Sequence, residues 1–87
     1  MVTLGSFKKD VKRIRKRNLR LERLEEVLNR LAADEPLPPQ CRPHRLSGDW
    51  SGYMECHVAP DWLLIWRITD DGELWLVRTG SHADLFG

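Results

Sequence analysis

The chain has 87 residues, of which 41% are hydrophobic and 31% charged. That length is enough for one modest core and too short for two, so we expect a single domain over residues 1–87. No apolar run approaches the roughly 20 residues that span a bilayer, and no signal-peptide core is present, which predicts a cytoplasmic protein. Cys41 and Cys56 are then expected as reduced thiols, with a disulfide between them left open.

The net charge of +1 hides an asymmetry along the chain. Residues 1–30 carry ten Lys/Arg and four Asp/Glu, whereas residues 31–87 carry four and nine. Eight positive charges fall between Lys8 and Arg20. A solvated helix face would account for such a run, but its density favours a surface that contacts phosphates. The residues predicted to contact phosphates are Lys8, Lys9, Lys12, Arg13 and Lys16.

Two helices are predicted in the first third of the chain, after a short strand over residues 2–4. Phe7, Val11 and Ile14 recur at the spacing of one helix face, which indicates a helix from about Phe7 to Arg17 with Ser6 as its N-cap. Asn18 is expected to break it. A second, stronger amphipathic helix follows, and the proline run that begins at Pro36 excludes its continuation. Its apolar positions are Leu21, Leu24, Val27, Leu28 and Leu31.

Beyond the prolines the hydrophobic period changes from 3.6 to 2. The alternation over residues 53–58 predicts a strand with Glu55 and His57 on one face and Cys56 and Val58 on the other. Pro60-Asp61 is a turn signal. Residues 62–69 carry apolar side chains at both odd and even positions, as in a central strand that is covered on both faces.

A third strand and a closing helical turn complete the predicted fold. Asp71-Gly72 indicates a hairpin turn before a strand over residues 73–79. Ser81 is expected to cap a turn of helix in which Leu85 and Phe86 pack back onto the sheet. The sequence therefore predicts an α+β fold, with an N-terminal helical hairpin packed on a three- to four-stranded antiparallel sheet.

All three histidines, His44, His57 and His82, lie in the C-terminal half of the chain. Histidine can both take and give a proton near neutral pH. A single histidine in a strand is more often a packed or surface residue than a catalyst. Three of them, with Asp61 at a turn and Arg78 near a strand end, favour a site for general acid–base cleavage, which needs a base, an acid and a cation.

A metal site is the alternative for these residues. His57 and Asp61 are four residues apart, and His82 would complete a three-ligand set. The first two are separated by a strand end and a turn rather than by a helical turn that would align them. Cys41 and Cys56 show no zinc-type pairing either. We therefore predict neither a metal nor another cofactor.

The four tryptophans divide into two groups. Trp66 and Trp75 lie within predicted strands and are expected to fill the core. Trp50 and Trp62 flank the proposed site, and core filling is their alternative role. Their position makes them candidates for stacking on a base.

The C-terminal half contains an ordered set of motifs. They are His44-x-Leu46-x-Gly48-x-Trp50-x-Gly52-Tyr53, then His57-Val58-x-Pro60-Asp61-Trp62-Leu63-Leu64-Ile65, then Arg78-Thr79-Gly80-Ser81-His82-Ala83-x-Leu85-Phe86. A set of this length is far more specific than any one of its motifs. It resembles the YafQ family of RelE-type toxins closely over residues 44–87, and the basic first helix and leucine-rich second helix fit the same pattern.

The resemblance implies a RelE-like fold and a toxin of a bacterial type II toxin–antitoxin system. Such a toxin is an mRNA interferase that cuts messenger RNA on the translating ribosome without a metal, by attack of the substrate's 2′-hydroxyl on the adjacent phosphate. Carried over by position, the acid–base set is His44, His57, Asp61 and His82, with Trp62 and Phe86 shaping the pocket. Arg78 is added from chemistry, because a guanidinium suits a phosphate that gains charge.

One position departs from the family pattern. Relatives often have arginine where this chain has Met54, directly before Glu55. Arg67 and Arg45 are candidates to replace that charge. If neither does, the chain is a catalytically weakened relative.

Two classes of function therefore stay open. One is an active ribosome-dependent endoribonuclease, and the other is a weakened relative that binds an antitoxin and acts as a DNA corepressor. For both, the resemblance implies a ribbon-helix-helix antitoxin similar to DinJ, with operator DNA reached only through that antitoxin. The first class alone predicts growth arrest when the toxin is expressed by itself.

Overall fold

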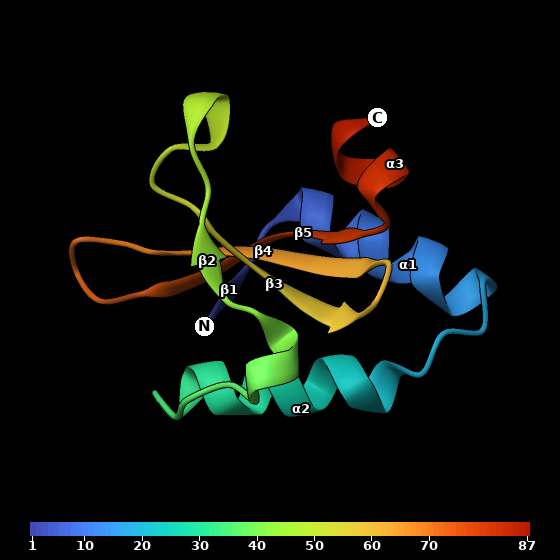
Figure 1. Ribbon diagram of the computed structural model, residues 1–87, viewed down its shortest axis with the longest axis horizontal. Helices are drawn as coiled ribbons and strands as arrows, with labels where there is room; N and C mark the ends of the chain where they lie inside the picture. Colours follow the sequence, from blue (N-terminus) through green and yellow to red (C-terminus); the bar gives the residue numbers. More distant parts are fainter.

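A five-stranded sheet forms the centre of the computed structural model, which describes residues 1–87. The strand order is β1-β5-β4-β3-β2, and Figure 1 shows α2 on one side of the sheet and α3 on the other. None of the helices is both long and apolar enough to span a membrane. The elements in chain order are β1 (Val2–Thr3), α1 (Gly5–Lys16), α2 (Leu21–Ala32), η1 (Pro39–Cys41), β2 (His44–Arg45), η2 (Gly48–Trp50), β3 (Met54–Ala59), β4 (Trp62–Ile68), β5 (Leu74–Gly80) and α3 (His82–Phe86).

Strand β4 lies between two apolar clusters, as its apolar run predicts. Trp62, Leu64 and Trp66 join buried side chains of α1 and α2 in the larger cluster. Leu63 and Ile65 point to the opposite face and pack with Val77 of β5 and Leu85 of α3. Because side chains alternate along a strand, one central strand anchors all three helices.

The α+β class is confirmed, and the sheet has one more strand than the sequence predicts. Strand β1 pairs in parallel with β5, whereas the other neighbours are antiparallel, so the sheet is mixed. Strand β2 adds only His44 and Arg45 to the edge of β3. Strand β1 corresponds to the short strand predicted over residues 2–4, whereas β2 is the strand that the sequence does not predict. With only two residues, β2 is too short for a period of 2 to be recognised.

The predicted helices are confirmed, but the predicted N-cap of the first is wrong. Helix α1 begins at Gly5, so Ser6 lies inside it, and the capping position belongs to Leu4. The Ser6 hydroxyl instead donates to the carbonyl of Val77 at 2.7 Å, which fastens the start of α1 to β5. Asn18 ends α1 as expected, with a left-handed φ of 58°.

A buried carboxylate ties the middle of α1 to the end of β5. Asp10 is only 1% exposed. It accepts two hydrogen bonds from the Arg78 guanidinium, at 2.7 and 3.2 Å, and a third from the backbone N–H of Thr79 at 3.1 Å. Arg13 adds a contact at 3.3 Å. The hydrogen bond from Arg78 to Asp10 raises the pKa of the guanidinium above its ordinary value. The Arg78 guanidinium therefore keeps its charge, and the buried Asp10 carboxylate has hydrogen-bond donors for both of its oxygens.

Replacing Asp10 with alanine should destabilise the protein by roughly 3 kcal/mol, because it strands a partly buried guanidinium and a buried amide. Urea denaturation measures the change. The matched control is Glu26→Ala, which removes only the exposed Arg30–Glu26 pair at 3.7 Å and should cost less than about 1 kcal/mol. Equal effects of the two substitutions would contradict the role given to Asp10.

Candidate active site

The β3–β4 turn and the start of α3 meet through Asp61 and His82. The Asp61 Oδ1 atom accepts hydrogen bonds from the backbone N–H of His82 at 3.2 Å and from the His82 ring Nδ1 at 3.0 Å. The bond from the ring, followed by the bond from the backbone, lowers the pKa of Asp61 below its ordinary value. The carboxylate is thus ionised near neutral pH. With Nδ1 directed at Asp61, the Nε2 atom of His82 is the nitrogen left for a substrate.

Helix α3 is held firmly although it contains only five residues. The Ser81 hydroxyl accepts from the Asp84 N–H at 3.1 Å, and the Asp84 carboxylate accepts from the Ser81 N–H at 2.9 Å, which confirms the predicted cap. Arg17 donates two further bonds to Asp84 at 2.6 and 3.0 Å. The Arg17 bonds and the Ser81 N–H hold the pKa of Asp84 well below its usual range. These contacts fix the position of His82.

Leu85 and Phe86, the last two apolar residues of α3, differ in burial. Leu85 packs onto the sheet as predicted, at 9% exposed. Phe86 does not, since it is 47% exposed. Its ring instead lies 6.1 Å from Trp50 and 6.3 Å from His82, centroid to centroid. Trp50 in turn meets Tyr53 edge-on at 5.4 Å. The aromatic rings of Trp50 and Phe86 therefore form an open wall beside His82.

His57 faces His82 across the mouth of the site. Their ring centroids lie 6.2 Å apart, and the His57 ring makes no hydrogen bond with the protein. His57 is half-buried on β3, on the face that the alternation predicts. Two imidazoles at this separation can reach one group placed between them. The structure thus brings together His57, Asp61 and His82.

The His44 ring is held apart from His57 and His82 by one hydrogen bond and one contact with a carboxylate. Its Nδ1 lies 2.9 Å from the Arg42 carbonyl, which can only accept, so Nδ1 carries a proton. Its Nε2 lies 3.2 Å from Glu55 Oε1, its partner across the β2–β3 ladder. Glu55 is 5% exposed, and its Oε2 atom has no hydrogen-bond partner. Both ring nitrogens are therefore occupied, and Glu55 is a site residue that the predicted set omits.

The placement of Trp62 corrects the prediction that it stacks on a base. It is 3% exposed and belongs to the core. Its indole N–H donates to the Thr79 hydroxyl at 2.9 Å, and that hydroxyl donates to the Leu63 carbonyl at 2.7 Å. Trp62 directly follows Asp61, so this bond fixes the turn that carries the carboxylate. The role that the structure supports for Trp62 is positioning.

Arg78 also lies elsewhere than predicted. Its guanidinium is bound by Asp10 rather than directed to the histidines, so its charge is already neutralised. Met54, where the resemblance led us to expect an arginine, is partly buried against the larger core cluster, on the face opposite His57. Arg67 lies 5.7 Å from the centre of the Tyr53 ring. None of these positions supplies a free cation next to His57.

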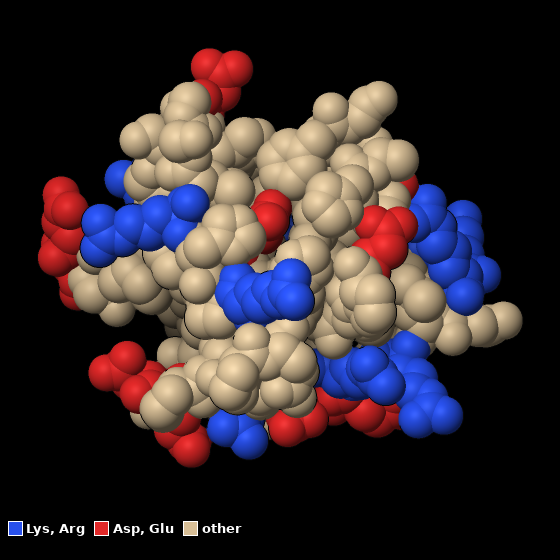
Figure 2. All heavy atoms as spheres, viewed as in Figure 1, with Lys and Arg blue, Asp and Glu red and all other residues tan.

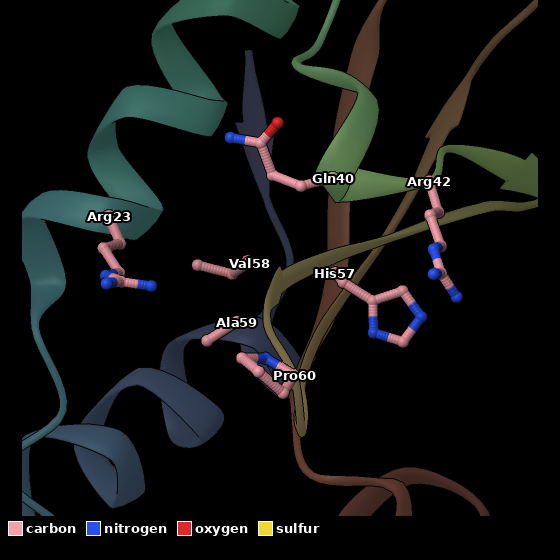
Figure 3. A pocket seen from close by; sticks show the side chains of 7 residues that line it. All are labelled: Arg23, Gln40, Arg42, His57, Val58, Ala59 and Pro60. Carbon is pink, nitrogen blue, oxygen red and sulfur yellow. The ribbon is translucent and has the colours of Figure 1, made fainter.

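A cavity of about 390 Å³ adjoins His57 (Figure 3). It extends between α2, η1 and the end of β3, and Figure 3 shows the Arg42 and His57 side chains on one side of the strand and Arg23 on the other. Neither arginine forms an ion pair. The lining residues are Arg23, Gln40, Arg42, His57, Val58, Ala59 and Pro60.

The predicted RNA-binding residues lie on the exposed face of α1. Lys8, Lys9, Lys12 and Lys16 are exposed, and Arg13 is half-buried against Asp10. Figure 2 shows basic side chains gathered at the end of the molecule where α1 meets the start of α2, away from the acidic residues of the opposite end. This is the arrangement expected of a surface that meets a polyanion.

The side chains offer little for metal or thiol chemistry. No three His, Cys, Asp or Glu side chains are grouped so that they could hold a metal ion. Cys41 and Cys56 are free and buried. Burial raises the pKa of Cys56 to about 12, so its thiol is protonated near neutral pH and is a poor nucleophile.

The fold and the site together define the class of protein. It is a small α+β domain with two facing histidines, one of which is oriented by a carboxylate. The chain belongs to the YafQ family, the bacterial toxins of type II toxin–antitoxin systems, whose family model matches residues 1–87. The mRNA interferase toxin YafQ of Escherichia coli strain K12 is 43% identical over 84 residues, covering 95% of this chain and 90% of that protein.

Two solved structures show how far the similarity extends. The DinJ–YafQ complex of E. coli matches with a TM-score of 0.91 and 41% identity, over 99% of this chain and 96% of that chain. A metal-bound toxin from Helicobacter pylori matches with a TM-score of 0.89 and 40% identity, over 97% and 94%. The recognised family and the RelE-like fold are thereby confirmed.

Glu55 should control the ring of His44. Replacing Glu55 with alanine removes the partner of Nε2, so the ¹⁵N signals of both His44 ring nitrogens should shift and the ring protons should exchange faster with water. Glu55→Gln keeps an acceptor oxygen and should restore the wild-type pattern in part. Unchanged His44 signals in Glu55→Ala would show that the 3.2 Å contact does not hold the ring.

Proposed function

We propose that the protein is the toxin of a type II toxin–antitoxin system and acts as a ribosome-dependent endoribonuclease on translated mRNA. The observation that carries this proposal is the His57–His82 pair, whose ring centroids lie 6.2 Å apart and in which Asp61 binds His82. Such a pair can take one proton and give another at a single phosphate. The similar E. coli protein is an mRNA interferase toxin, which supports the same activity for this chain.

The geometry supports His82 as the base and His57 as the acid. Asp61 orients the His82 ring through Nδ1 and stabilises the imidazolium that forms when Nε2 takes the proton of the substrate's 2′-hydroxyl. The 2′-oxygen then attacks the adjacent phosphorus, and the bond to the 5′-oxygen breaks. His57 gives its proton to that departing oxygen. The products are a 2′,3′-cyclic phosphate and a 5′-hydroxyl, with no redox change.

The other site residues act around this proton transfer. Both ring nitrogens of His44 contact protein groups, so His44 acts by position rather than as a free base. The exposed ring of Phe86 and the half-buried ring of Trp50 beside it offer a surface on which a base can stack. Lys8, Lys9, Lys12, Arg13 and Lys16 would meet ribosomal RNA through phosphate contacts.

The antitoxin is the second partner that we propose. The DinJ–YafQ complex is similar over 99% of this chain, which supports a cognate antitoxin of the same kind. Operator DNA would be reached only through that antitoxin. The site of action would be the cytoplasm, where translating ribosomes occur.

A weakened relative that acts only as an antitoxin-binding corepressor is the second candidate. The observation that favours it is the loss of free positive charge at two positions, since Arg78 is paired with Asp10 and Met54 is uncharged. Expression of the chain without antitoxin distinguishes the two, because only the enzyme arrests growth.

His82→Ala should slow cleavage by a hundredfold or more, the usual share of a general acid or base. Single-turnover cleavage on programmed ribosomes measures the loss, and circular dichroism checks the fold. Ala83→Ser, an exposed neighbour on the same helix, is the matched control and should cleave at the wild-type rate. Wild-type rates for His82→Ala would remove this residue from the chemistry.

Cleavage should persist when transition metals are removed, because the proposed proton transfers use only side chains. A chelator selective for transition metals leaves ribosomal magnesium in place, so the ribosomes stay intact during the assay. The similar H. pylori toxin was solved with a bound metal, so metal-assisted cleavage is the alternative that this test addresses. Loss of cleavage that one added divalent ion restores would establish metal-assisted hydrolysis instead.

A further inference from the structure

We infer that the cavity beside His57 is a phosphate subsite for the RNA strand, in which Arg42 supplies the cation that Arg78 does not. This inference rests on the proposed ribonuclease function and names where the substrate backbone next to the scissile phosphate lies. The ligand class is single-stranded RNA, recognised through its phosphates.

The first argument is the distribution of free charge around the histidines. Arg78 is paired with the buried Asp10, and Arg17 is paired with Asp84. Arg42 is exposed and has no acidic partner, and it lines the same cavity as His57. In Figure 3 its guanidinium extends from the chain after η1 toward the side of β3 from which the His57 ring projects. An unpaired guanidinium beside an acid–base histidine suits a phosphate oxygen.

The second argument is that the backbone of Arg42 is fixed on both sides. Its N–H donates to the Pro39 carbonyl at 3.1 Å, and its own carbonyl lies 2.9 Å from the His44 Nδ1. Its φ of 48° places it in the left-handed region, which sets the direction of the side chain relative to β2. Arg42 thus connects the His44 ring to the His57 cavity through a rigid turn. A rigidly based cation loses less freedom when it binds.

The third argument is the shape of the cavity. Strand β2 pairs only with Met54 and Glu55, so the part of β3 from Cys56 onward extends past its neighbour and forms the cavity wall. Arg23 of α2, also without an ion pair, stands across the strand end, and Gln40 adds an amide that can contact a base edge. An RNA strand that passes His57 and Arg42 can therefore contact a second guanidinium, that of Arg23, with its next phosphates.

The test pairs protein variants with a substrate that lacks one charge. An mRNA with a single neutral methylphosphonate linkage next to the cleavage site is compared with normal mRNA in steady-state cleavage on ribosomes over a range of mRNA concentrations. Arg42→Gln should raise KM about tenfold with little change in kcat, since the contact binds substrate before and during the reaction. The neutral linkage should then cause no further loss in Arg42→Gln, although it weakens binding to the wild type.

Arg45→Gln is the matched control, because Arg45 is an exposed arginine on β2 that does not line this cavity. Its effect should be small and should add to that of the neutral linkage. A wild-type KM for Arg42→Gln, or losses that add fully, would overturn the subsite. So would an Arg42→Gln variant that binds normal RNA but loses affinity for the antitoxin, since the cavity would then hold a peptide.

A binding assay separates this inference from the proposed function. Fluorescence anisotropy with a short single-stranded RNA that carries 2′-deoxyribose at the cleavage position measures binding without chemistry. Weaker binding by Arg42→Gln, with a salt dependence reduced by about one phosphate contact, supports the subsite even if the wild type fails to cleave. Equal binding by wild type and variant would contradict the subsite even if cleavage is normal.

Discussion

One buried hydrogen-bond relay fixes both halves of the proposed active site. Asp10 of α1 accepts from the Thr79 N–H, and the Thr79 hydroxyl accepts from the Trp62 indole and donates to the Leu63 carbonyl. Asp61 directly precedes Trp62, and His82 follows Thr79 by three residues. The relay therefore holds the two chain segments that carry the carboxylate and its histidine. Because every member is satisfied, it behaves as one rigid unit.

The relay explains why two residues that the sequence assigned to the site, Trp62 and Arg78, have structural roles instead. Trp62 contributes its indole N–H and its volume to the core, and Arg78 satisfies Asp10. The proposed proton transfers are left to His57 in the second half of β3, Asp61 in the turn after it and His82 at the start of α3. Side chains at element ends combine access to substrate with a fixed backbone.

The features that follow from local pattern were predictable from the sequence. The alternation in β3 placed Glu55 and His57 on one face, and the Ser81 cap and the burial of Leu85 followed from their spacing. The partners of Arg78 and Trp62 were not predictable, because Asp10 and Thr79 lie 68 and 17 residues away in the chain. The same holds for Glu55, whose contact with His44 depends on a strand of two residues.

The account depends on His57 and His82 acting on one phosphate in the same step, and a double-mutant cycle tests this most directly. Single-turnover cleavage is measured for His57→Ala, His82→Ala and the double variant, each checked for folding. Residues that work as a unit are strongly non-additive. The account predicts that the double variant cleaves about as slowly as the slower single variant. Losses that multiply in the double variant would show that the two histidines act independently.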